Sequence, residues 1–154
     1  MVRYLIIDEL EKESTWKLFL LSVLTLTIYA GHYVCKQSRT INRFSPEEKI
    51  PLGFTNILLI LSYTLAFLTV LDLFVVLSER AVMTFTMLNN AWGIMTIFWG
   101  FMARKRMNTL LGGRPGDRSW FSGLWTFLFS PYYFNYKLNC LSVPTLPADK
   151  AVED

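Results

Sequence analysis

The feature that most constrains this chain is an apolar run from Leu52 to Leu77, in which Asp72 is the one charged residue. The hydrocarbon core of a bilayer is about 30 Å thick, and a helix needs about 20 apolar residues to cross it. The run is longer than this minimum. We therefore expect a helix that crosses a membrane and either tilts or projects beyond the core.

Three further apolar runs follow the same logic. Trp16–Cys35 carries one charge, at its start, and Thr84–Phe101 is uncharged and just long enough to span. Trp120–Phe134 is shorter and contains a proline, and such runs are more often re-entrant or interfacial, although a fourth span is the alternative. The sequence thus predicts an all-α membrane protein with three transmembrane helices, over about residues 16–35, 52–77 and 84–101, plus a short C-terminal interfacial or re-entrant helix over 120–134.

Composition agrees with this class. Hydrophobic residues make up 53% and charged residues 18% of the chain, whereas soluble domains carry about 25% charged residues. Disordered chains lack such apolar content. Residues 1–15 are too acidic for a cleavable signal peptide, so we expect an N-terminal segment, a membrane domain over 16–141, and a disordered polar tail over 142–154.

The distribution of Lys and Arg predicts an orientation. The N-terminal segment and the loop near Arg80 are poor in cations, whereas the first and third loops are rich in them. Cytoplasmic loops carry an excess of Lys and Arg. With three spans, the N-terminus is expected outside and the first and third loops in the cytoplasm.

Aromatic, basic and Asn residues recur in that order where three apolar runs end. This pattern has a general reading, because aromatic belts, positive-inside bias and helix-closing Asn residues produce it in many membrane proteins. A more specific reading is a cationic platform for anionic lipid headgroups or an acidic partner. The candidate residues are Lys36, Arg39, Arg43, Arg104, Lys105 and Arg106.

Asp72 is the one acid within a predicted span. Measured from the predicted ends of the second and third spans, it lies at the same depth as Asn89 and Asn90. Polar groups at one depth in neighbouring helices tend to hydrogen-bond. We expect an intramembrane polar clasp of Asp72 with Asn89 or Asn90; an ion or proton site and snorkelling to the outer interface are the alternatives.

Few residues offer catalytic or ligating chemistry. His32 is the one histidine, and haem needs two axial ligands and zinc three or four. Cys35 and Cys140 lack C-x-x-C spacing, and no phosphate-binding or hydrolase motif occurs. We therefore expect no enzyme activity, cofactor or metal. The basic loops are too short and too close to the bilayer to favour nucleic acid.

Two segments carry a resemblance to a known family. TLTIYAGHYVCKQSRTIN (residues 25–42) and GLWTFLFSPYYFNYKLN (residues 123–139) resemble the opening and closing signatures of a family of small bacterial multi-pass membrane proteins, catalogued as a domain of unknown function. The resemblance spans roughly residues 16–141, and Tyr136 and Asn139 match the closing pattern. It implies a multi-pass protein of the bacterial inner membrane and supplies no activity.

These features favour a non-catalytic small integral membrane protein, an accessory or interaction subunit of a larger membrane complex. Its expected partners are the bilayer, through anionic headgroups on the cytoplasmic side, and other membrane subunits. The alternatives are a component of an oligomeric channel or transporter, a membrane immunity-type protein, and a lipid-modifying enzyme. Three spans cannot enclose a transport pathway alone, and transporters tend to show paired repeats.

Overall fold

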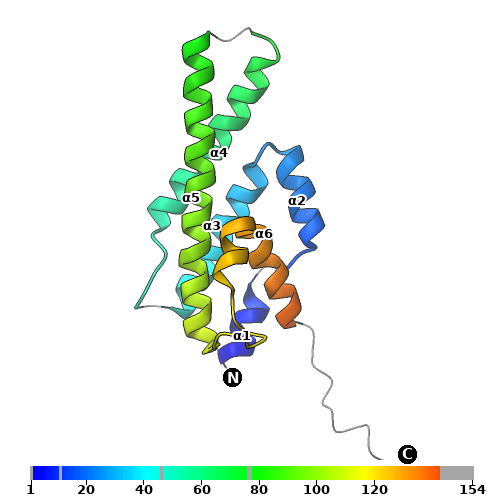
Figure 1. Ribbon diagram of the computed structural model, residues 1–154, viewed down its shortest axis with the longest axis vertical. Coiled ribbons are helices and arrows are strands. Elements are labelled where there is room, and N and C mark those ends of the chain that lie inside the picture. The colour runs from blue at the N-terminus through cyan, green and yellow to red at the C-terminus, as the bar shows by residue number, and fades with distance from the viewer. Residues whose placement is uncertain (1, 11, 46, 76–77, 143–154) are drawn as a thin grey trace, which may run out of the picture.

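The computed structural model describes residues 2–10, 12–45, 47–75 and 78–142 (Figure 1). All regular secondary structure in these residues is helical, so the predicted all-α class is confirmed. The predicted disordered tail and the end of the predicted second span (residues 76–77) lie outside the described residues. The helices are α1 (Val2–Glu9), α2 (Thr15–Leu24), α3 (Ile28–Phe44), α4 (Leu52–Asp72), α5 (Glu79–Leu111) and α6 (Gly123–Ser142).

The first apolar run does not form one helix. Helices α2 and α3 reverse direction at Leu26 and Thr27, whose φ angles are 50° and 75°, and together they form what we term the N-terminal hairpin (Figure 1). The hydroxyl of Thr25 donates to Leu21 O and accepts the amide of Tyr29. A threonine side chain that bonds the backbone in this way competes with helix continuation. The prediction of a single span over residues 16–35 is therefore wrong.

The long hairpin consists of α4 and α5. Its connection lies at the end of the molecule opposite to α1, and the two helices cross as they run down from it (Figure 1). Ser78 caps α5 by accepting the amide of Ala81, and Gly112, in the left-handed conformation, ends it. Among the described helices, α4 alone is long and apolar enough to cross a membrane by length and composition. Asn89 and Asn90 lower the hydropathy of α5.

Helix α6 is broken into two arms, residues 123–129 and 131–142, which we term the C-terminal hairpin. The break lies at Ser130, with φ 30° and ψ −106°, directly before Pro131. Proline lacks an amide hydrogen and disfavours helical backbone in the residue before it. Arg118 Nη2 donates to Cys140 O at 2.7 Å, so the end of the second arm lies beside the segment that leads into the first. The run over 120–134 is therefore not a continuous helix.

The tips of the two broken hairpins point toward the α4–α5 connection and pack against the long hairpin through glycines. A Cβ added at Gly31 of α3 would lie 2.7 Å from Ser62 Oγ of α4, and one added at Gly100 of α5 would lie 3.0 Å from Ser130 Oγ. Both approaches are closer than ordinary carbon–oxygen contact. Small residues are what allow helix backbones to come this close.

We expect Gly31→Ala to lower the free energy of unfolding by about 1–3 kcal/mol, the usual cost of overpacking a close contact. Its control is Gly53→Ala in α4, because a Cβ at Gly53 meets nothing within 4 Å. Ala is favoured over Gly in a helix by about 0.5–1 kcal/mol, so the control should be neutral or stabilising. Thermal unfolding of both variants in detergent measures the difference. Equal stability would show that the α3–α4 contact is looser than described.

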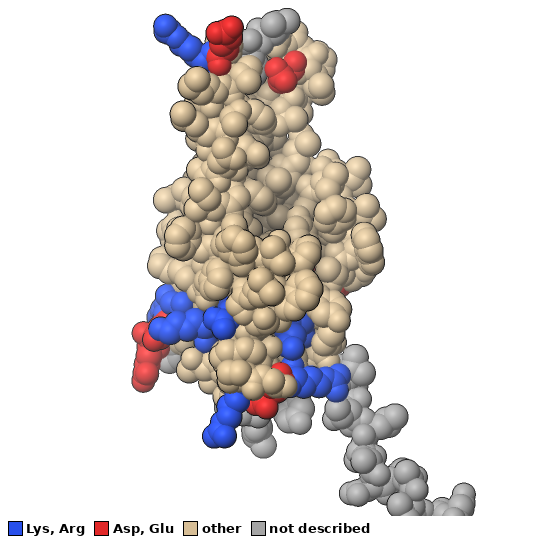
Figure 2. Space-filling view, in the orientation of Figure 1, with Lys and Arg blue, Asp and Glu red and all other residues tan. Residues whose placement is uncertain are grey.

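Several polar side chains are buried beside the hydrophobic core of the fold, and much of its surface is apolar. Ser38, Thr55 and Ser62 are fully buried, whereas Phe74 is 81% exposed and Phe67 65% exposed. Figure 2 shows a broad uncharged band on the viewed face, with charged side chains confined to the two ends. Only 28% of the apolar window of α4 is buried within the molecule. Many apolar side chains of α4 therefore face outward.

Candidate functional site

Most charged side chains gather at one end of the molecule, which we term the cationic end (Figure 2). Glu9 of the N-terminal segment forms an ion pair with Arg43 at the end of α3, at 3.7 Å. These residues were expected on opposite sides of a membrane. They lie together because α2 and α3 form a hairpin rather than one span, so the predicted separation of the N-terminus from the first loop is wrong.

Two of the three cations predicted in α5 hold the loops of this end through hydrogen bonds to backbone oxygens. Arg104 Nε donates to Phe121 O at 2.8 Å, and its guanidinium lies 5.2 Å from the centre of the Trp120 ring. Arg106 donates to the backbone oxygens of Glu48 and Lys49. These contacts give both arginines structural roles within the chain.

Lys105 completes this group through an ion pair at the surface. Its Nζ lies 3.0 Å from Glu48 Oε1, and this hydrogen bond and charge lower the pKa of the Glu48 carboxyl. Both side chains are exposed, and exposed ion pairs contribute little to stability. Lys105 therefore links α5 to the loop before α4 without fixing it strongly.

The predicted clasp of Asp72 with Asn89 or Asn90 is not formed. All three side chains are exposed, and no hydrogen bond joins Asp72 to either asparagine within the described residues. The reason is the length of α4, which ends at Asp72 instead of continuing to Leu77. Asp72 therefore lies at the α4–α5 connection, whereas α5 begins at Glu79 and carries Asn89 and Asn90 several turns further along.

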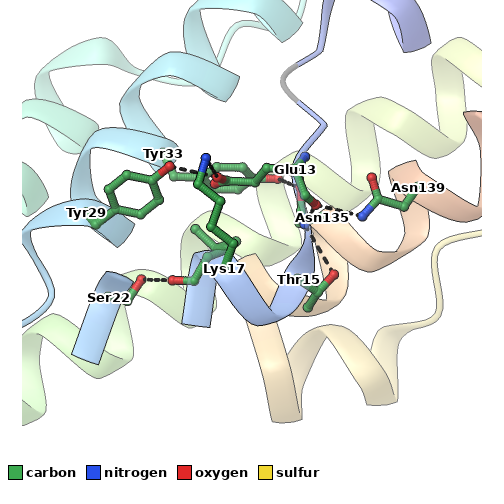
Figure 3. Close-up of polar contacts among 9 residues, drawn as sticks. Glu13, Thr15, Lys17, Ser22, Tyr29, Tyr33, Asn135 and Asn139 are labelled. Atoms are coloured by element: carbon green, nitrogen blue, oxygen red, sulfur yellow. Dashed lines mark hydrogen bonds and ion pairs between the residues drawn. The ribbon is translucent and has the colours of Figure 1, made fainter. Parts of the chain in front are cut away.

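A polar centre that the sequence did not predict surrounds Glu13, between α1 and α2 (Figure 3). The Glu13 side chain is 8% exposed, and its Oε2 accepts the hydroxyl of Tyr29 at 2.7 Å and lies 3.7 Å from Lys17 Nζ. Its second oxygen, Oε1, is buried and has no hydrogen-bond partner among the described residues. A buried carboxylate oxygen without a hydrogen-bond partner is costly to the fold.

Two asparagines of α6 hold the backbone of Glu13. Asn135 accepts the Glu13 amide through Oδ1 and donates to Glu13 O through Nδ2 at 2.7 Å. Asn139, one turn later, donates to the same oxygen at 2.8 Å. The Tyr33 hydroxyl of α3 donates to Asn135 Oδ1. Glu13 is thus fixed by α3 and α6, which are distant in sequence.

A cavity of about 410 Å³ opens beside Glu13. Its walls include Glu13, two predicted cations, Lys36 and Arg39, and His32, whose Nε2 lies 2.7 Å from the hydroxyl of Tyr63 in α4. Cys35, a free thiol, and Leu59 also line it. The volume falls within the 300–1,000 Å³ typical of small-molecule sites. Lys36 and Arg39 therefore line this cavity, and the third cation of this helix, Arg43, lies at its end and pairs with Glu9.

The residues of this centre lie in segments that the sequence analysis considered, but their proximity could not be predicted from the sequence. Glu13 directly precedes the first apolar run, and Asn135 and Asn139 lie in the closing signature near the other end of the chain. Their meeting depends on the two hairpins, which periodicity does not reveal. Among the described residues, no group of three or more His, Cys, Asp or Glu side chains is placed to hold a metal ion.

Comparison with known protein families identifies a match to part of the chain. The family described as "Domain of unknown function (DUF4234)" matches residues 13–109, which run from Glu13 through α2, α3, α4 and most of α5. No curated protein and no solved structure matches the chain significantly.

Proposed function

Since the chain belongs to the DUF4234 family, a domain of unknown function, we propose its function from its own side chains: it is an integral membrane protein whose helices α4 and α5 cross the bilayer. In this proposal the N-terminal and C-terminal hairpins enter the membrane from the cationic end and return to it. The single observation that carries the proposal is the broad exposed apolar surface between two charged ends. Buried Ser, Thr and Asn side chains with an outward apolar surface suit a hydrocarbon surrounding.

The lengths of the helices support two spans. α4 has 21 residues and α5 has 33, which correspond to about 30 and 50 Å at 1.5 Å per residue. The lower part of α5, with Arg104, Lys105 and Arg106, then projects beyond the hydrocarbon at the cationic end. Non-helical backbone at the tips of the broken hairpins is tolerated in a membrane where it packs against protein, as these tips do against α4 and α5.

The proposed orientation places the cationic end in the cytoplasm. Arg80 is the one Lys or Arg that the sequence places at the α4–α5 connection, and the remaining cations fall on the other side of both spans. This asymmetry is stronger than the one that three spans would give, and it follows the positive-inside rule. Together with the family resemblance, it favours the inner membrane of a bacterium, with both ends of the chain inside.

We propose a non-catalytic role as an accessory subunit of a larger membrane complex. The long hairpin extends past the tips of the other two hairpins, so its upper part is covered by no other described helix (Figure 1). Phe67 and Met87 are both exposed there. Large apolar side chains on a rigid helix pair provide a surface on which a transmembrane helix of another subunit can pack.

Site-specific photo-crosslinking in native membranes tests this role. A photoreactive residue at Phe67 or Met87 should capture one discrete membrane protein, and the same residue at Phe127 of the C-terminal hairpin serves as the matched control. Capture at the long hairpin and not at the control supports an accessory subunit. A chain that gives no crosslinked product at either position, and that purifies as a monomer from native membrane, would contradict this role.

A further inference from the structure

A groove runs along the C-terminal hairpin, and its two ends differ in chemistry. Toward the break at Ser130, a cavity of about 510 Å³ is lined by Thr15 and by aromatic residues of both arms, Trp125, Phe129, Tyr132, Tyr133 and Tyr136. Toward the cationic end, a second cavity of about 630 Å³ lies between the segment before α6 and the end of the second arm. The two cavities share Trp125, Tyr133 and Tyr136, so they form one continuous groove, which we term the hairpin groove.

The aromatic part of the hairpin groove is accessible from outside the molecule. Trp125 is 50% and Phe129 is 49% exposed, and their rings stack with centres 5.8 Å apart. The tip of this hairpin points toward the α4–α5 connection, away from the cationic end (Figure 1). In the proposed orientation this part therefore opens to the hydrocarbon, where an aromatic wall suits an acyl chain.

Two cations line the other end of the groove. Arg118 Nη2 donates to Cys140 O at 2.7 Å, and Lys137 lies one turn before Cys140 on the second arm. No hydrogen bond or ion pair joins Lys137 to another described residue. Burial is the main reason that the pKa of the Lys137 ammonium is lowered, and the charge of Arg118 acts in the same direction. The two cations are therefore close enough to repel each other, and an anion between them would relieve this repulsion.

The net charge of the groove limits the anion. Asp117 also lines the cationic part, but its Oδ2 accepts the Arg114 amide at 2.8 Å and closes the turn before α6. The charged residues among the described lining are thus two cations and one acid. A phosphodiester carries one negative charge, which complements this net charge, and its oxygens can accept from both cations.

The anionic and apolar groups of the ligand must belong to one molecule of limited length. Lys137 of the cationic part and Tyr132 of the aromatic part lie on the same arm, about 8 Å apart at 1.5 Å per residue. A ligand that fills the groove therefore joins its anion to its apolar chain over a short distance. A phospholipid has this form, with its phosphodiester at the membrane surface and its acyl chains in the hydrocarbon.

We propose that the hairpin groove binds one anionic phospholipid. Its phosphodiester lies between Arg118 and Lys137, and one acyl chain lies along the aromatic part toward Ser130. This site rests on the proposed membrane location, in which the two cations lie at the level of the cytoplasmic headgroups. It is separate from the cationic platform expected from the sequence, because none of those six cations lines the groove. Basic pockets beside membrane helices on the cytoplasmic side bind such headgroups.

The first test uses the unaltered full chain and two lipids with the same acyl chains. Native mass spectrometry counts the lipids retained from mixed micelles that contain equal amounts of phosphatidylglycerol and phosphatidylcholine. One phosphatidylglycerol should remain per chain, retained at least about tenfold better than phosphatidylcholine. Glycerophosphoglycerol, the headgroup without acyl chains, should not displace it at equal concentration. Equal retention of the two lipids, or displacement by the soluble headgroup, would overturn the proposal.

The second test removes a charge from the groove. Lys137→Gln should lower the preference for phosphatidylglycerol about fivefold, the usual contribution of one cation near an anionic surface, and Lys137→Arg should keep it. Arg114→Gln is the matched control, because it removes a charge from the same end of the molecule and does not line the groove. Circular dichroism verifies that the variants are folded. Unchanged preference in Lys137→Gln, or equal losses in Lys137→Gln and Arg114→Gln, would overturn the assignment.

The third test examines the aromatic part. Phe129→Ala should weaken the retention of phosphatidylglycerol, whereas Phe127→Ala, on the same arm and 54% exposed but outside the groove, should not. Equal retention in these two variants would overturn the position of the acyl chain. Resistance to extraction by alkaline carbonate reads the membrane location separately. A chain that resists extraction and shows no lipid preference would contradict this site alone and leave the proposed spans in place.

Discussion

Replacing Trp99 with Ala is expected to lower the free energy of unfolding by about 3–5 kcal/mol, the range for removing a large buried aromatic. Trp99 is fully buried in α5, donates its indole N–H to Ser38 Oγ of α3 at 2.8 Å, and packs edge-on against Phe134 of α6 with ring centres 5.4 Å apart. One side chain thus joins the long hairpin to both broken hairpins. Its loss removes a hydrogen bond and leaves a cavity where the three meet.

The matched control is Phe98→Ala, which alters the adjacent residue of the same helix. Phe98 is 62% exposed, so its truncation should cost less than about 1 kcal/mol. Reversible unfolding in detergent micelles measures both variants. Similar costs for the two would show that α5 does not pack against α3 and α6 through the Trp99 face.

Replacing Asn135 with Leu is expected to cost about 2–4 kcal/mol. Asn135 is fully buried and bonds the Glu13 amide and carbonyl, the Tyr33 hydroxyl and Thr15 Oγ1. Leucine has a similar volume but bonds none of these groups, and each buried polar group left unsatisfied costs about 1–3 kcal/mol. Because Asn139 still donates to Glu13 O, the total should stay below the sum of the separate costs.

Asn89→Leu in α5 is the control for this change, because Asn89 is exposed and forms no hydrogen bond with Asp72 in the described part of the chain. Its free energy of unfolding should be unchanged or slightly higher in detergent. The opposite result, with Asn89→Leu costly and Asn135→Leu neutral, would support the predicted Asp72 clasp and contradict the hydrogen bonds described around Glu13.

The sequence predicted the all-α class of the fold, but it did not predict where the chain turns back within the first apolar run. Apolar length identified an all-helical chain and located α4 and the middle of α5. It could not reveal that Thr25 ends α2 through its own hydroxyl, because an uncharged run has the same hydropathy whether it continues or turns back. Pro131 did signal the break in α6, since proline restricts the residue before it whatever the tertiary structure.

The predicted cations differ in the contacts they make in the structure. Such contacts cannot be predicted from spacing along the sequence. Lys36, Arg39 and Arg43 share an exposed face of α3; the structure pairs Arg43 with Glu9, and Lys36 and Arg39 line the cavity beside Glu13. The asparagines with structural roles are Asn135 and Asn139 rather than Asn89 and Asn90. The predicted clasp failed because α4 ends at Asp72, five residues before the predicted end of the second span at Leu77.

Thiol labelling in intact cells tests the central claim, two spans with two re-entrant hairpins, most directly. Single cysteines replace Asp8, Arg43, Ser78 and Arg114 in a chain whose native Cys35 and Cys140 are serine, and each is exposed to a membrane-impermeant maleimide. The account predicts that the cysteine at 78 reacts in intact cells, while those at 8, 43 and 114 react only after permeabilisation. Reaction at 8 but not at 43 in intact cells would place the N-terminus and the first loop on opposite sides, and would contradict the re-entrant N-terminal hairpin.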